Sequence, residues 1–93
     1  MSNEFPHSEQ YRLAGEEWVD KESAARLLED TKDAIMAQKQ AELGDLSVAK
    51  AKQLVLASPA WLKHVERIVL ARTEANRAKI RLKVAEMRYF ENQ

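Results

Sequence analysis

The chain contains few residues whose types and spacing could support catalysis or metal binding. Ser47 and Lys50 match the serine–lysine motif S-x-x-K of penicillin-binding enzymes, but the companion motifs are absent and Ser47 stands where a helix cap is expected. His7 and His64 are far apart, and neither lies in a zinc-ligand pattern such as H-E-x-x-H. The chain has no cysteine, which excludes thiolate zinc sites and cysteine nucleophiles. We therefore expect no enzyme activity, no metal site, no cofactor and no small-molecule substrate.

The distinctive chemical property is an uneven charge distribution. Net charge is zero, yet residues 1–46 hold eleven acids and five bases, whereas residues 47–93 hold ten bases and four acids. A basic helix can pair with an acidic helix across a seam, or it can bind phosphate groups. The candidate residues for binding nucleic acid or another partner are Arg72, Arg77, Lys79, Arg81, Lys83 and Arg88.

Helical position separates these candidates into two groups. Arg81 and Arg88 fall at one flank of the expected helix seam, and Arg72 and Lys79 fall at the other, so these four divide between seam pairing and ligand binding. Two further residues lie away from the seam and are freer for a ligand, namely Arg77 and Lys83. The sequence leaves open whether the basic helix pairs with the acidic helix or binds phosphate groups.

The composition predicts an all-α fold. The chain has 93 residues, enough for one small domain, with 14 alanines but only two glycines and two prolines. We expect an N-terminal arm over residues 1–7 and a single helical domain over 8–93, with helices at about 8–43, 48–57 and 59–90. Ser8, Ser47 and Ser58 are the expected N-caps, and Gly44 is expected to end the first helix in a left-handed conformation. Long, short and long helices predict an antiparallel hairpin.

Apolar residues at alternating three- and four-residue steps predict the seam between the two long helices. Alanine dominates its middle, which allows close approach of the helices. The seam residues are Trp18, Leu28 and Ile35 of the first helix and Trp61, Ile68, Ala75, Leu82 and Tyr89 of the third.

A second group of apolar residues in the third helix lies away from this seam. We expect the short helix to cover the part from Leu62 to Val69, but ten helical residues reach only about 15 Å. Ile80, Val84 and Met87 would then remain uncovered. They predict self-association into a homo-oligomer through this face.

The sequence has no apolar run near 18 residues and no basic-then-apolar leader. We therefore expect no membrane association and a cytoplasmic location.

Three stretches of the chain resemble a group of small helical proteins encoded by bacteriophages and prophages near recombination genes. These stretches are Trp18 with residues 24–28, the corner from Gly44 to Trp61, and residues 71–79 with the Met-Arg-Tyr-Phe-Glu ending at 87–91. Within phage recombination the nearest analogy is a mediator of the UvsY type, which is small, helical and oligomeric and binds single-stranded DNA. The resemblance implies the cytoplasm of a bacterial host, and it assigns no role to individual residues.

These observations predict a non-enzymatic, oligomeric helical accessory protein of phage origin that binds single-stranded DNA or a recombination protein. The alternative is an adaptor or inhibitor that binds a host factor through its helical surface, without nucleic acid. In that case the acidic first half, from Glu16 to Asp33, presents the binding face.

Overall fold

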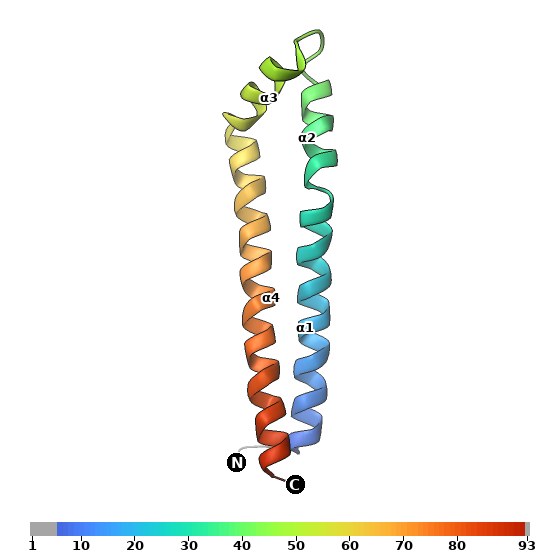
Figure 1. The fold of residues 1–93 in the computed structure, drawn as a ribbon, viewed down its shortest axis with the longest axis vertical. Coiled ribbons are helices and arrows are strands. Elements are labelled where there is room, and N and C mark those ends of the chain that lie inside the picture. The colour runs from blue at the N-terminus through green and yellow to red at the C-terminus, as the bar shows by residue number, and fades with distance from the viewer. Residues whose placement is uncertain (1–5, 93) are drawn as a thin grey trace.

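The computed structural model describes residues 6–92, in which four helices form a long antiparallel hairpin. The helices are α1 (His7–Asp30), α2 (Lys32–Ala41), α3 (Val48–Leu56) and α4 (Pro59–Glu91). α1 and α2 make one arm, α4 makes the other, and α3 lies at the corner between them (Figure 1). The molecule measures 65 × 18 × 17 Å, and the main contact between the arms is that of α1 with α4. The predicted all-α hairpin is confirmed.

Local capping chemistry fixes the helix boundaries at the corner. The Ser47 hydroxyl accepts a hydrogen bond from the Lys50 N–H at 3.2 Å, and the Ser58 hydroxyl accepts one from the Trp61 N–H at 3.2 Å. Pro59 occupies the first position of α4, where its missing N–H costs nothing. The second and third predicted helices are therefore correct to within one residue at each end.

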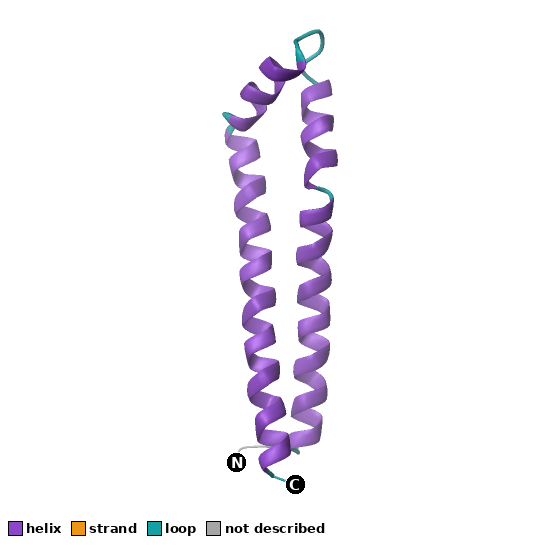
Figure 2. Ribbon diagram, in the orientation of Figure 1, coloured by secondary structure: helices purple, strands orange, loops and turns teal. Residues whose placement is uncertain are grey.

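The first predicted helix, over 8–43, is wrong in two respects: it is divided at Thr31 and it ends at Ala41. The Thr31 hydroxyl donates to the Leu27 carbonyl at 2.7 Å, and this side-chain bond competes with the helical ladder. Thr31 separates α1 from α2, although the Ile35 N–H still bonds the Thr31 carbonyl at 3.0 Å, so the arm continues in the same direction (Figure 2). The arm's last helix ends at Ala41, and Gly44 has the expected positive φ of 77° in the turn that follows.

The start of the first arm also differs from the prediction. Pro6 is the N-cap of α1 and has no side-chain cap bond, so Ser8 lies inside the first turn and does not cap the helix. His7 is helical and does not belong to the predicted arm. The rest of that arm, residues 1–5, lies outside the described residues.

The core is a line of small residues between the arms. The buried apolar residues are Ala25, Ala51, Val55, Trp61, Ala75 and Ala78, and His64 is buried beside Trp61. The other predicted seam residues, Trp18, Leu28, Ile35, Ile68, Leu82 and Tyr89, are half-buried. Trp61 is the one large apolar side chain that is buried within residues 6–92, so the hairpin holds little apolar surface away from water for its size.

The short helix does not cover α4 as the sequence predicted. α3 packs more against α2 than against α4, and the Leu62 and Val69 side chains of α4 remain 58% and 55% exposed. The physical reason is the short link at Ala57–Ser58, which places α3 on top of α4 and leaning toward α2, so that it cannot fold back along α4 (Figure 1).

The two glycines predict opposite effects of an added methyl group. A Cβ at Gly15 would lie 3.8 Å from Leu82 Cδ1, an ordinary contact, and alanine is the better helix former by about 1 kcal/mol. We expect Gly15→Ala to raise the free energy of unfolding by about 0.5–1 kcal/mol. Gly44→Ala should lower it by about 1–2 kcal/mol because of the left-handed backbone.

Urea denaturation followed by circular dichroism, at one protein concentration for all three chains, measures both changes. An unchanged or lower urea concentration at the unfolding midpoint of Gly15→Ala would contradict the packing of α1 on α4 at Gly15 and Leu82.

Candidate nucleic-acid interface

Arg72 lies at the seam and is held by two carboxylates of α1. Its Nε and Nη2 donate to the two carboxylate oxygens of Glu29 at 2.8 and 2.7 Å. Its Nη1 and Nη2 donate to those of Glu22 at 2.7 and 3.2 Å. Both contacts are bidentate, the strongest form of arginine–carboxylate pairing. Arg72 was a candidate ligand-binding residue, but its donors are directed at α1.

Hydrogen bonding within this cluster shifts the pKa of each of its three members so that the charged form is favoured. The bonds from Arg72 lower the pKa of both Glu22 and Glu29 below the usual carboxyl range. In return, the bonds to Glu29 and Glu22 raise the pKa of Arg72. Each charged form therefore stabilises the other, and the cluster favours the antiparallel pairing of α1 with α4.

The opposite flank of the seam carries two further ion pairs between the arms. Arg81 of α4 bonds Glu17 of α1, and the Lys21 Nζ of α1 lies 3.4 Å from an oxygen of Glu74 of α4. These pairs are exposed and individually weak. They assign Arg81, like Arg72, to pairing between the arms.

The remaining candidates lie on different sides of α4. Arg77 and Arg88 are exposed and make no ion pair within residues 6–92. Lys79 also makes none in that part of the chain, and Lys83 makes a long contact of 3.8 Å with Glu86. At about 100° per residue, Lys79 and Lys83 fall on the opposite side of α4 from Arg77 and Arg88. The six predicted residues therefore do not form one site.

Arg77 and Arg88 instead share a sector of α4 with two bases outside the predicted set. Lys63 and Arg67 are exposed and unpaired within the described residues, and with Arg77 and Arg88 they fall within about 80° around the helix axis. We call these four residues the basic ridge. The signal that could have identified the two added bases is heptad spacing: Arg67 shares one heptad position with Arg81 and Arg88, and Lys63 shares another with Arg77.

Aromatic side chains close the open end of the hairpin and lie away from the basic ridge. Tyr11 of α1 packs against Tyr89 and Phe90 of α4, with ring centroids 5.4 and 6.4 Å apart. The Tyr11 hydroxyl donates to Glu86 at 3.1 Å, and this bond raises the pKa of Tyr11. Tyr89 and Phe90 therefore serve the contact between the arms, and within residues 6–92 the basic ridge has no aromatic platform beside it for stacking bases.

Within the described residues, no three histidine, aspartate or glutamate side chains gather closely enough to hold a metal ion. No helix of that same part combines the length and apolarity needed to cross a bilayer.

Comparison with protein-family models, with curated proteins and with solved structures found no match to this chain.

The Arg72 cluster predicts a specific pH dependence of stability. Because the pKa values of Glu22 and Glu29 are lowered in the folded chain, the unfolded chain takes up more protons as the pH falls. The stabilisation is present above the ordinary carboxyl pKa of about 4.3 and is lost as the pH drops through the lower folded values. We expect the melting temperature to fall between pH 5 and pH 3, and Arg72→Met to remove part of this dependence.

Arg26→Met is the matched control, because Arg26 contacts Glu22 only from an exposed position one turn away, at 3.2 Å. Thermal melts at constant ionic strength compare the three chains. Equal pH dependence in Arg72→Met and Arg26→Met would contradict the role given to Arg72.

Proposed function

We propose that the protein is a non-enzymatic accessory protein whose helix α4 binds the phosphate backbone of single-stranded nucleic acid. The observation that carries the proposal is the basic ridge. Lys63, Arg67, Arg77 and Arg88 are exposed, lie on one side of a continuous helix, and have no carboxylate partner within residues 6–92. Cations in such a row attract phosphate through charge alone.

The shape of α4 supports contact with an extended strand. From Lys63 to Arg88 the ridge runs about 38 Å at 1.5 Å per residue, long enough for several nucleotides. The acids of the same sector are few, and Glu74 is already paired with Lys21 across the seam. The ridge lacks stacking aromatics among the described residues, so we propose binding that depends on salt and not on base sequence.

The phage recombination setting is part of this proposal and rests on the sequence resemblance alone. The adaptor alternative requires a negative surface on the first arm. Several acids there hold cations instead: Glu16 pairs with Arg12, Glu17 with Arg81, and Glu22 and Glu29 with Arg72. This neutralisation is why we favour the basic surface of α4 over the acidic surface of α1.

The test is fluorescence anisotropy of a labelled single-stranded oligonucleotide at about 50 mM salt, where phosphate contacts are strongest. Four contacts predict a slope of log K against log salt of roughly −3, from −0.7 per phosphate on a single strand. The double variant Arg77→Glu/Arg88→Glu should bind at least about tenfold more weakly, with a slope near −1.5 or shallower.

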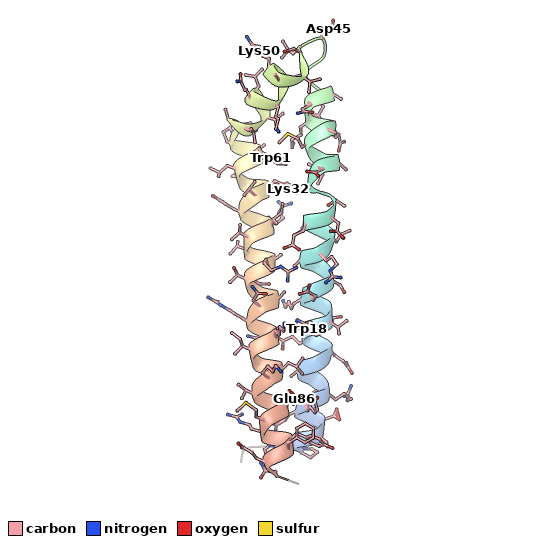
Figure 3. All side chains as sticks on the ribbon, viewed as in Figure 1. Trp18, Lys32, Asp45, Lys50, Trp61 and Glu86 are labelled. Carbon is pink, nitrogen blue, oxygen red and sulfur yellow. The ribbon has the colours of Figure 1, made fainter. Side chains whose placement is uncertain are left out.

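The matched control is Lys50→Glu/Lys52→Glu, which changes net charge equally but lies on α3 at the corner, where Figure 3 labels Lys50, and not on α4 beside Arg77 and Arg88. It should bind nearly as tightly as the natural sequence. No binding at about 50 mM salt, or equal loss in both double variants, would overturn the proposal.

A further inference from the structure

α4 carries a second apolar stripe that the other residues of 6–92 leave largely uncovered. Leu62, Val69, Ile80, Val84 and Met87 are all exposed, from 40% for Val84 to 64% for Ile80. The stripe lies roughly a third of a turn from the seam, so α1 does not block it. Its positions advance along α4 in steps of three, four, four, three, four, four and three residues: Leu62, Val65, Val69, Thr73, Asn76, Ile80, Val84 and Met87.

This stripe is symmetric about its own midpoint, which falls between residues 74 and 75. Each position on one side has a counterpart at the same distance on the other side. Leu62 corresponds to Met87, Val65 to Val84, Val69 to Ile80, and Thr73 to Asn76. Apolar residues correspond to apolar residues throughout, and the two polar residues correspond to each other at the centre.

We propose that this stripe is the interface of a homodimer, in which α4 of a second copy lies antiparallel on α4 across a two-fold axis between residues 74 and 75. A two-fold interface requires that if residue i of one copy contacts residue j of the other, then j contacts i. The symmetric spacing meets that requirement over the whole stripe. The occupant is therefore a second copy of this chain.

The surface area fits a small and weakly bound dimer. The stripe is about 38 Å long and a helix about 10 Å wide, so each copy buries on the order of 400 Å², and the total of about 800 Å² lies below the roughly 1,000 Å² of stable specific interfaces. A single hairpin has a core of mainly small residues, with no large side chain fully buried in its described part. The second copy supplies the apolar burial that one hairpin lacks.

The centre of the stripe sets the register. In the symmetric arrangement the polar residues Thr73 and Asn76 face their counterparts across the axis. A shift by one heptad would place Asn76 against an apolar residue and leave a polar group unsatisfied. The polar pair therefore disfavours shifted dimers, and the basic ridge, on another side of α4, stays exposed.

The first experiment measures mass by light scattering at tens of micromolar. The natural chain should have twice the mass of one chain, and Ile80→Glu should shift the equilibrium to the monomer by at least tenfold in dissociation constant. Leu70→Glu is the matched control, because Leu70 is also 64% exposed on α4 but lies outside the stripe. A monomeric natural chain, or the same mass for both variants, would overturn the proposal.

The second experiment remains valid if Ile80→Glu fails to fold. The chain has no cysteine, so single cysteines report position without background. Thr73→Cys should cross-link to Asn76→Cys under mild oxidation when the two variants are mixed, because these positions correspond across the axis. Met87→Cys alone should not form a disulfide with its own copy, but it should cross-link to Leu62→Cys when those two variants are mixed.

A parallel dimer would instead place every residue opposite itself. Efficient self-linking of Met87→Cys, or no link in the Leu62→Cys and Met87→Cys mixture, would therefore overturn the antiparallel arrangement. Both experiments are done without nucleic acid, so their failure is distinguishable from failure of the phosphate-binding proposal.

Discussion

The small size of the seam residues is the constraint on which the rest of the structure depends. Ala25 of α1 and Ala75 and Ala78 of α4 are buried almost completely, and they allow α1 and α4 to lie close together. The same choice limits stability, because an alanine buries far less apolar surface than leucine or isoleucine. A hairpin of this kind therefore depends on interactions beyond its core.

Polar pairing provides one such interaction and fixes how the arms match. Apolar steps of three and four residues allow several registers along an alanine seam, since each alanine resembles the next. Arg72 breaks this equivalence, because only one register brings Glu22 and Glu29 together around its guanidinium. The exposed Arg81–Glu17 pair supports that register from the other flank. Acidic residues of the first half and basic residues of the second half thus pair with each other where α1 faces α4, and these pairs fix the register of the two arms.

The sequence identified features that depend on neighbours along the chain. The caps at Ser47 and Ser58 and the positive φ of Gly44 follow from local chemistry, and all three are found in the structure. The interruption at Thr31 was missed because a threonine bond to a preceding carbonyl is optional in any helix. Helical position in the sequence already separated Arg72, at a flank of the seam, from Arg77, which lies away from it; which carboxylates hold Arg72 was beyond prediction because it depends on the register of α1.

The three sectors of α4 explain how one helix can carry several interactions at once. With 3.6 residues per turn, the alanine seam, the apolar stripe from Leu62 to Met87, and the basic ridge each occupy about a third of the circumference. A contact on one sector leaves the other two accessible, so pairing with α1, pairing with a second copy and contact with phosphate do not compete. A two-fold dimer would also present two basic ridges running in opposite directions. Two antiparallel ridges double the charge that meets one strand, and this raises affinity through effective concentration without any additional type of contact.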